Sequence, residues 1–139
     1  MVAAADVHLV IQAERDPAYA AALNAFDIVT PDGQPVRWGL NLTAGAGLSD
    51  RVYGPTLMLD VCEAAAAEEL PVFLCGSREE TLQLLADRLA ERFPKLRVAG
   101  MRAGRFRPLT QEEQEQDAAE IRASGARITF VGMGCPRQE

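Results

Sequence analysis

Residues 72–93 read VFLCGSREETLQLLADRLAERF, and this stretch carries the strongest fold signal in the chain. Its first four residues form a short apolar run that is typical of a buried strand. Gly76 and Ser77 then turn the chain, and the SREE sequence that starts at Ser77 matches a capping box that begins a helix. Leucines and Phe93 recur behind it at helical spacing along one face. The stretch therefore predicts a strand followed by an amphipathic helix.

The same alternation continues on both sides of this unit. Further strands are predicted at residues 26–30, 96–99 and 127–131, and further helices at residues 17–24, 56–70 and 110–123, the last opened by a second capping box, TQEE. The rest of the Ala-rich stretch 7–24 has no settled type, residues 36–42 suit a strand or a helix, and residues 43–50 read as a loop. Strands that alternate with amphipathic helices predict an α/β fold, with a Rossmann-like parallel sheet covered by helices on both faces.

Length and composition predict a single core domain over residues 1–139. Lys and Arg number 14 against 20 Asp and Glu, so the net charge is −6, which argues against a nucleic-acid binder. Cys62, Cys75 and Cys135 are widely spaced, so we expect neither a disulfide framework nor a zinc knuckle, and a reducing cytosol is the favoured compartment. No apolar run reaches the ~20 residues of a membrane span, and no signal peptide is recognisable. These features predict a soluble intracellular domain.

Four glycine-bearing loops follow predicted strands, at residues 31–33, 76–77, 100–104 and 132–136. In parallel sheets, ligands bind beyond the carboxyl ends of the strands. We therefore expect these four loops to meet at one edge and to form a binding site.

Each candidate residue also has a purely structural interpretation. Gly76 and Ser77 would place a phosphate at a helix N-terminus, but an ordinary capped helix explains them more simply. No GxGxxG follows this strand and no GxxxxGK[ST] occurs, which disfavours a dinucleotide site and a P-loop. The cations of residues 95–107, among them Arg102 and Arg105, either clamp a diphosphate or balance the acidic residues 112–120.

Asp32 lies in a Pro-Asp-Gly turn directly after a strand. Turn geometry alone can explain an aspartate there, whereas the functional interpretation is a general base at the mouth of a site. His8, the only histidine, suits a structural role better than a catalytic one. Trp38, Tyr19 and Tyr53 are expected in the core or half-buried.

The C-terminal sequence GMGCPRQE at residues 132–139 is too particular for a generic loop, and it resembles the G-x-G-x-P-[RK]-Q-E signature of the WecG/TagA/CpsF glycosyltransferases (glycosyltransferase family 26). Other segments are similar to that family's motifs in the same order: DIVTPDG at residues 27–33, DRVYG at residues 50–54, FLCGS at residues 73–77, then residues 93–96 and 100–106. The resemblance covers residues 7–139.

The resemblance implies an inverting transferase that moves a sugar, often N-acetylmannosamine, from a UDP-sugar to a lipid-linked sugar acceptor. It implies that Asp32 is the catalytic base and that Arg51 is an active-site arginine. It also places the nucleotide-sugar among residues from several loops: Gly33, Gly76, Ser77, Gly104, Arg105, Gly132, Gly134, Pro136, Gln138 and Glu139.

This chain departs from the family pattern at three places. Ala4 and Asp6 stand where family members usually carry Thr and Asn. The resemblance also implies an initial strand and helix before that point, and a further helix and a basic C-terminal appendage, associated with membrane docking, beyond the position of Glu139. We therefore expect a core domain without that appendage.

The expected partners are a UDP-sugar, a lipid-linked acceptor and the inner face of the cell membrane, contacted peripherally from the cytoplasm, with no nucleic acid; a second copy of the chain could cover an exposed edge. No cofactor is expected, and because the sequence contains no D-x-D pair, we expect metal-independent transfer. The alternative is a non-catalytic domain that binds UDP or a nucleotide-sugar.

Overall fold

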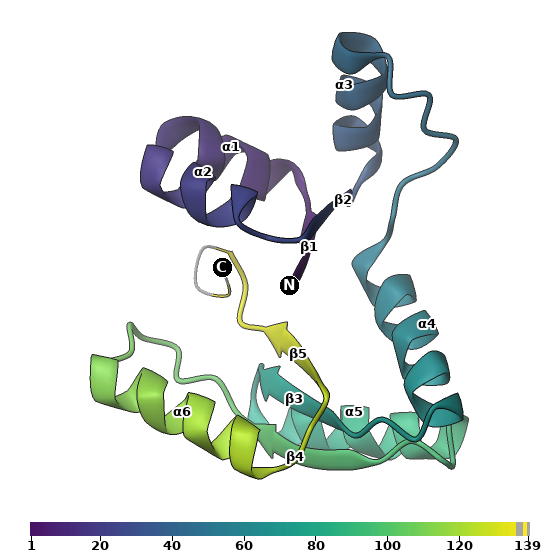
Figure 1. Cartoon of the computed structure of the whole chain (residues 1–139), viewed down its shortest axis with the longest axis vertical. Coiled ribbons are helices and arrows are strands. Elements are labelled where there is room, and N and C mark those ends of the chain that lie inside the picture. Colours follow the sequence, from purple (N-terminus) through teal and green to yellow (C-terminus); the bar gives the residue numbers. More distant parts are fainter. Residues whose placement is uncertain (136–137, 139) are drawn as a thin grey trace. The chain divides into compact units, whose positions relative to one another are not determined.

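A computed structural model describes residues 1–135 and 138, and it divides the chain into two compact units (Figure 1). The first unit comprises Met1–Leu57 and the second Met58–Gln138. Helix α4, Gly54–Ala67, contributes residues to both units. The expectation of one core domain over residues 1–139 stays a prediction.

The second unit is built on a three-stranded parallel sheet with the order β4-β3-β5. Its elements after α4 are β3 (Val72–Gly76), α5 (Glu79–Arg92), β4 (Val98–Arg102), α6 (Gln111–Ala123) and β5 (Ile128–Gly132). The central strand β3 is the buried one, because Val72, Phe73 and Leu74 are each at most 1% exposed. The continuous apolar run therefore forms a strand that is covered on both sides.

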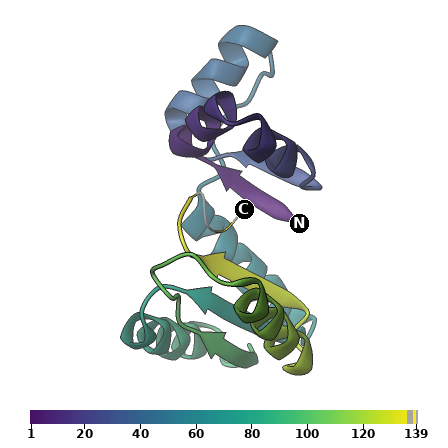
Figure 2. The ribbon, with the colours of Figure 1, turned by 90° about the vertical axis from the view of Figure 1, so that its left-hand side faces the viewer.

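Helices cover both faces of this sheet (Figure 2). Val72 and Leu74 point to one face, where they pack in a cluster with Cys62 of α4 and with Leu82 and Leu89 of α5. Successive side chains of a strand alternate, so Cys75 points to the opposite face. Its register partner, Arg102 of β4, forms ion pairs with α6 on that face. The second unit thus has the expected α/β layering.

The first unit holds a second, two-stranded parallel sheet. Its elements are β1 (Val2–Ala5), α1 (Val7–Arg15), α2 (Pro17–Asn24), β2 (Ile28–Pro31) and α3 (Gln34–Ala44). The strands pair from Val2 with Ile28 to Ala5 with Pro31. Ala3, Ala5, Leu9 and Leu23 are the buried apolar residues of this unit.

The α/β class, the parallel strands and the helices predicted around residues 17–24, 56–70 and 110–123 are confirmed. The structure differs in that the strands form two sheets, of two and three strands. Residues 36–42, which sequence left open, belong to helix α3, and this helix takes in the first two residues of the predicted 43–50 loop. Trp38, expected to be at least half-buried, is 61% exposed on α3, and Tyr53 is 47% exposed.

Candidate functional site

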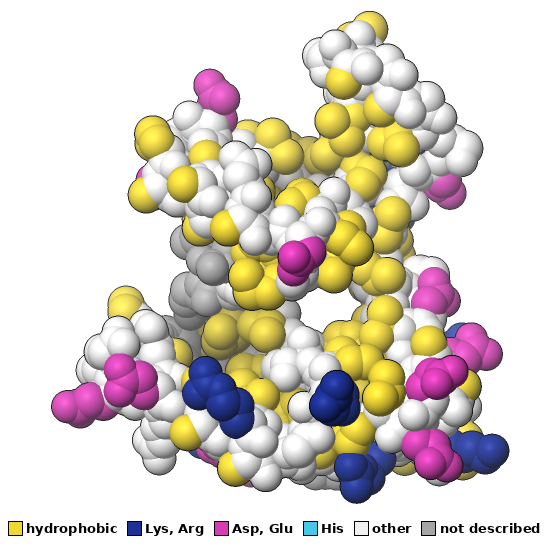
Figure 3. Space-filling model, viewed as in Figure 1, with side chains coloured by type: hydrophobic (Ala, Val, Ile, Leu, Met, Phe, Trp, Pro, Cys, Tyr) yellow, Lys and Arg dark blue, Asp and Glu magenta, His cyan; other side chains and the backbone are white. Residues whose placement is uncertain are grey.

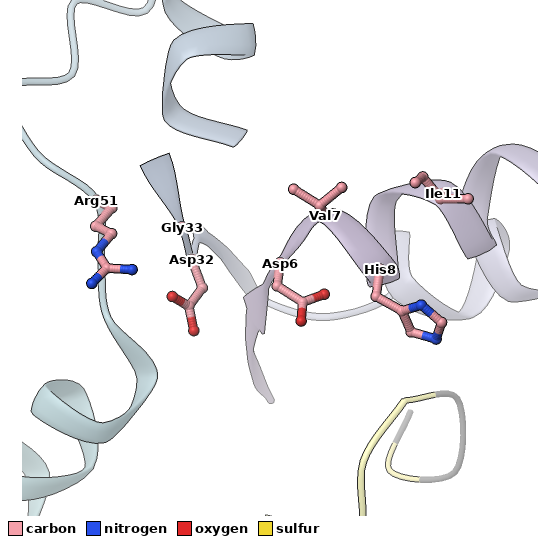
Figure 4. A pocket seen from close by; sticks show the side chains of 7 residues that line it. All are labelled: Asp6, Val7, His8, Ile11, Asp32, Gly33 and Arg51. Carbon is pink, nitrogen blue, oxygen red and sulfur yellow. The ribbon is translucent and has the colours of Figure 1, made fainter. Parts of the chain in front are cut away.

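A hollow of about 550 Å³ in the first unit gathers charged side chains from three segments (Figure 4). Asp32 and Gly33 follow β2, and Arg51 comes from the segment before α4. The remaining lining residues are Asp6, Val7, His8 and Ile11, at the start of α1 and just before it. The two residues predicted to be catalytic, Asp32 and Arg51, therefore share one pocket.

Asp32 is positioned by the backbone on both of its sides. Its N–H donates to the carbonyl of Ala5 at 2.9 Å, which extends the pairing of β1 and β2 by one residue. One carboxylate oxygen, Oδ2, accepts a hydrogen bond from the N–H of Gly54 at 3.2 Å. Among the described residues nothing bonds to Oδ1 of Asp32. The carboxylate is thus held by one oxygen and has the other available to a ligand.

A side chain at Gly33 or Gly54 would strain or crowd the backbone around the Asp32 carboxylate. Gly33 has φ +93 and begins α3, a backbone conformation that L side chains rarely adopt. A Cβ on Gly54 would lie 3.2 Å from Oδ2 of Asp32 and 3.6 Å from Cβ of Ala4. Small residues on both sides therefore let the backbone approach the aspartate closely.

Arg51 contacts two residues close to it in the chain, Tyr53 through its side chain and Asp50 through its backbone. Its guanidinium lies over the ring of Tyr53, 4.5 Å from the ring centre, which is a cation–π contact. The backbone N–H of Arg51 donates to Oδ1 of Asp50 at 2.7 Å. This bond, together with one from the side chain of Gln34, lowers the pKa of the Asp50 carboxyl. Figure 4 shows the Arg51 side chain extending beside Asp32. The pocket therefore offers both a carboxylate and a cation.

Asp6 and His8 line the same pocket, although the sequence argument assigned them no catalytic role. Asp6 is the N-cap of α1, and its Oδ1 accepts from the N–H of Leu9 at 2.9 Å. An asparagine at this position would cap the helix equally well. His8 is helical and exposed. The sequence offered one signal for this part of the pocket, the departures from the family pattern at Ala4 and Asp6. In the structure Asp6 shares the pocket with Asp32, and Ala4 packs against Gly54.

In the second unit, three of the four glycine loops come together at the carboxyl ends of β3, β4 and β5. The Ser77 N–H donates to the Gly132 carbonyl at 3.2 Å, and the Ser77 carbonyl accepts from the Gly104 N–H at 2.9 Å. A Cβ on Gly76 would lie only 2.4 Å from the Gly132 oxygen. The fourth loop, at residues 31–33, follows β2 of the other sheet, so the meeting of all four stays a prediction.

The capping box predicted at Ser77 is not formed. Ser77 has φ +55, helix α5 takes Arg78 as its N-cap, and no side chain caps it. Ser77 adopts this left-handed conformation because its peptide groups are used by the neighbouring loops. The first-turn N–H groups of α5 therefore have no capping side chain, although that turn also carries Glu79 and Glu80. By contrast, the second predicted capping box, Thr110 with Glu113, is present in full.

The arginines that follow β4 are paired with acidic residues of α6. Arg102 forms ion pairs with Asp117 and Glu120, and Nη1 of Arg105 lies 3.3 Å from Oδ2 of Asp117. Arg107 donates to both carboxylate oxygens of Glu113, at 2.6 and 2.8 Å. These contacts favour the structural interpretation of the cationic stretch over a free diphosphate clamp.

The C-terminal motif is described in part. Gly134 has φ +77, and its N–H donates to Oε1 of Gln138 at 3.1 Å, so the Gln138 side chain closes this loop. The predicted site residues Pro136 and Glu139 lie outside the described residues.

The described residues hold neither a cluster of metal ligands nor a helix that could cross a membrane. Within residues 1–135 and 138, no three His, Cys, Asp or Glu side chains cluster as metal ligands would. In the same part of the chain, none of the helices has the length and apolarity needed to cross a bilayer. Metal-independent transfer stays a prediction.

Comparison with known proteins adds an independent result. The model of the glycosyl transferase WecG/TagA/CpsF family matches residues 1–139. The chain is also 28% identical over 138 residues to an N-acetylglucosaminyldiphosphoundecaprenol N-acetyl-beta-D-mannosaminyltransferase of Bacillus spizizenii (strain ATCC 23059 / NRRL B-14472 / W23). That match takes in 99% of this chain and 51% of the relative, so the chain spans about half the length of the relative. Because the family model matches the chain from end to end, the chain belongs to the WecG/TagA/CpsF family of glycosyl transferases.

Proposed function

We propose that this chain is the core of an inverting glycosyltransferase that moves N-acetylmannosamine or a related hexose from a UDP-sugar to a lipid-diphosphate-linked sugar. The product would serve the synthesis of a cell-surface polysaccharide or teichoic acid, at the cytoplasmic face of the membrane. The observation that carries the proposal is the Asp32 carboxylate, held through Oδ2 in a pocket that also contains Arg51. Family membership and the activity for which the Bacillus relative is named support it.

In this mechanism Asp32 acts as general base. Its free oxygen takes the proton of an acceptor hydroxyl, and the resulting oxygen attacks the anomeric carbon of the donor sugar. The bond from that carbon to the diphosphate breaks, and UDP leaves with the bonding electron pair. Attack from the face opposite the leaving group inverts the anomeric centre. Arg51 supplies positive charge in the same pocket, where it would stabilise an anionic substrate group.

We assign binding of the nucleotide-sugar to the glycine loops of the second unit. Gly76, Gly104 and Gly132 lie without side chains at the strand ends, which is where ligands of parallel sheets bind. The uncapped first turn of α5 supports a phosphate there, whereas Glu79 and Glu80 in that turn oppose it. The ion pairs of Arg102 and Arg105 and the bonds among the loops leave the first-turn N–H groups of α5, which have no capping side chain, as the main candidates for contacting the diphosphate.

The test of this proposal is Asp32→Asn in the full-length protein. General-base catalysis is typically worth about 10²–10⁴-fold in rate, so turnover should fall by about that factor. The amide can still accept from the Gly54 N–H, so thermal stability and UDP binding should stay near the wild-type values. Asp16→Asn is the matched control: this aspartate caps α2 in the same unit, and asparagine caps equally well. Wild-type turnover in Asp32→Asn would show that Asp32 is not the general base and that it only shapes the turn.

A second candidate is a non-catalytic domain that binds a nucleotide-sugar. The observation that favours it is the pair of departures beside the pocket, Ala4 and Asp6, where the family usually has Thr and Asn. Thermal melts with UDP, with AMP as control, separate the two, because a ligand that binds the native state raises its stability. A UDP-specific rise without sugar transfer would favour the binding domain.

A further inference from the structure

The turn that carries Asp32, residues 31–34, also holds the segment that carries Arg51, residues 50–54. Three hydrogen bonds join the two: the Val52 N–H to the Pro31 carbonyl at 2.9 Å, the Gly54 N–H to Oδ2 of Asp32 at 3.2 Å, and Nε2 of Gln34 to Oδ1 of Asp50 at 3.3 Å. Every second residue of the segment is bonded, and Arg51 lies between two of them. The turn therefore holds the backbone on both sides of Arg51.

The two residues between these anchors, Arg51 and Tyr53, have no hydrogen bond to the turn within residues 1–135 and 138. Their side chains contact each other instead, with the Arg51 guanidinium 4.5 Å from the centre of the Tyr53 ring. Side chains two residues apart fall on one side of a chain whose residues alternate in direction. The Arg51 side chain is thus directed away from the anchors and into the pocket that it shares with Asp32.

The charge of Arg51 is available to a ligand. In the part of the chain that the structure describes, its guanidinium forms neither an ion pair nor a hydrogen bond, whereas Arg102 and Arg105 are paired with acidic residues of α6. A guanidinium offers five N–H donors to an anionic group. It binds more strongly when it is ordered beforehand, because less conformational entropy is then lost. What holds Arg51 in place therefore affects how well it can bind.

The Gln34 amide lies between a cation and a carboxylate. Its Oε1 accepts from Nη1 of Arg37 at 3.0 Å, and its Nε2 donates to Oδ1 of Asp50. An arginine can only donate and an ionised aspartate can only accept, so the amide has a single orientation. The same Oδ1 of Asp50 accepts from the backbone N–H of Arg51 at 2.7 Å. A continuous chain of hydrogen bonds thus runs from helix α3 to the backbone of Arg51.

Helix α3 directs these polar side chains towards the rest of the first unit. Gln34 and Arg37 are half-buried, whereas the face of α3 drawn in Figure 3 shows apolar side chains and no Lys or Arg. Partial burial restricts the rotamers that both side chains can adopt. The amide of Gln34 is therefore held where it meets Asp50.

We propose that Gln34 and Asp50 are positioning residues that hold the Arg51 guanidinium beside Asp32, where it meets an anionic group of the substrate. The inference rests on the proposed function, in which Asp32 removes a proton and Arg51 stabilises an anionic group such as a diphosphate. Gln34 and Asp50 act through Arg51 and not on the reacting atoms. Because Asp32 and Gln34 flank Gly33, one turn places the base and the cation together.

A double-mutant cycle in the full-length protein tests whether Gln34 acts through Arg51. Gln34→Met keeps a side chain of similar length but forms neither hydrogen bond. It should lower kcat/KM for sugar transfer by about tenfold or more, because small displacements of a group in the site cost up to ~10²-fold. In an Arg51→Gln background the same substitution should change kcat/KM by less than about twofold. Gln111→Met is the matched control, since Gln111 makes the same kind of bond, to Glu115 at 2.8 Å on α6, and it should behave as the wild type does.

Asp50 provides a second variant and a conservative rescue. Asp50→Ala removes the oxygen that both N–H groups share and should reproduce the loss of kcat/KM. Asp50→Asn keeps an acceptor oxygen and should recover most of it. If Gln34 and Asp50 only stabilised the fold, their variants would lose activity to the same extent with and without Arg51.

NMR provides a measurement that needs no turnover. The Arg51 N–H and the Gln34 amide lower the pKa of the Asp50 carboxyl. A titration followed at the carboxyl carbon should therefore show a higher pKa for Asp50 in Gln34→Met and the wild-type pKa in Gln111→Met. The side-chain signals of Arg51, which lies over the Tyr53 ring, should also move in Gln34→Met and stay in place in Gln111→Met.

Three results would overturn the inference: an Asp50 pKa that Gln34→Met leaves unchanged, Arg51 signals that do not move, or an equal loss of kcat/KM with and without Arg51. Normal sugar transfer by Gln34→Met also refutes the positioning role, and it leaves the proposed function intact. A wild-type protein that transfers no sugar refutes the proposed function, whereas the placement of Arg51 by Gln34 and Asp50 then stands if both NMR signals respond.

Discussion

Replacing Gly76 by alanine tests how closely the strand ends of the second unit approach one another. A Cβ at this position would lie 2.4 Å from the carbonyl oxygen of Gly132, 2.5 Å from its carbonyl carbon and 3.0 Å from the nitrogen of Met133. All three contacts are with backbone, which cannot move aside as a flexible side chain can. The φ of +114 adds a conformation that L residues rarely adopt. The variant therefore combines a steric clash with backbone strain.

The expected cost is the sum of two contributions. Backbone strain of this kind costs about 1–3 kcal/mol, and forcing an extra methyl group into a packed region costs about 1–3 kcal/mol. Gly76→Ala should thus lower the free energy of unfolding by about 2–6 kcal/mol, out of the ~5–15 kcal/mol that is typical of a domain. Gly125→Ala is the matched control, because Gly125 has φ +73 but nothing within 4 Å of its Cβ position. Only the strain remains there, about 1–2 kcal/mol.

The measurement is urea denaturation followed by circular dichroism at 222 nm, which reports helices of both units. Tryptophan fluorescence would be unsuitable, since Trp38 belongs to the first unit. The difference between the two variants isolates the close approach of Gly76 to Gly132. If Gly76→Ala proves as mild as Gly125→Ala, the backbone at Gly132 gives way easily, and the tight junction of these loops is refuted.

Two further predictions concern pH and metal ions. Hydrogen bonds from Arg107 and from the Thr110 N–H lower the pKa of Glu113 to about 2. Because this pKa is lower than the ordinary value of 4.5, ionised Glu113 stabilises the folded state at pH values above 4.5, and this contribution is lost as the pH falls towards 2. Glu113→Gln keeps a capping residue but cannot ionise, so its denaturation midpoint should depend less on pH than that of the wild type below pH 4.5, and equal slopes would contradict the ion pair. UDP-dependent stabilisation should survive excess EDTA, since the chain has no D-x-D pair and the first turn of α5 has no capping side chain on its N–H groups. Loss of the UDP response, restored by added magnesium or manganese, would show that a cation bridges the diphosphate.

The sequence alone determined the elements whose signals are local. The apolar run of β3 and the leucine spacing of α5 predict a strand and a helix, because burial on both faces leaves a continuous apolar run and burial along one stripe leaves a helical period. The Thr110 capping box was readable for the same reason, since donor and acceptor lie three residues apart. Asp32 and Arg51 were predicted as site residues from the family resemblance; the structure places both in one pocket, and their catalytic roles stay predictions.

Other features depended on residues far apart in the chain, and only the tertiary structure decided them. Ser77 looked like a helix cap, but its peptide groups bind Gly104 and Gly132, and those non-local bonds hold it in a left-handed conformation. For the arginines after β4, the sequence left open whether they bind a ligand or pair with acidic residues, and the structure shows Arg102 and Arg105 in ion pairs with Asp117 of α6. The exposure of the Trp38 side chain could not be predicted from the sequence either, because helix propensity indicates that a helix forms but not which residues pack against it. Local patterns encode secondary structure, whereas the partners of a polar or apolar side chain are chosen by the fold.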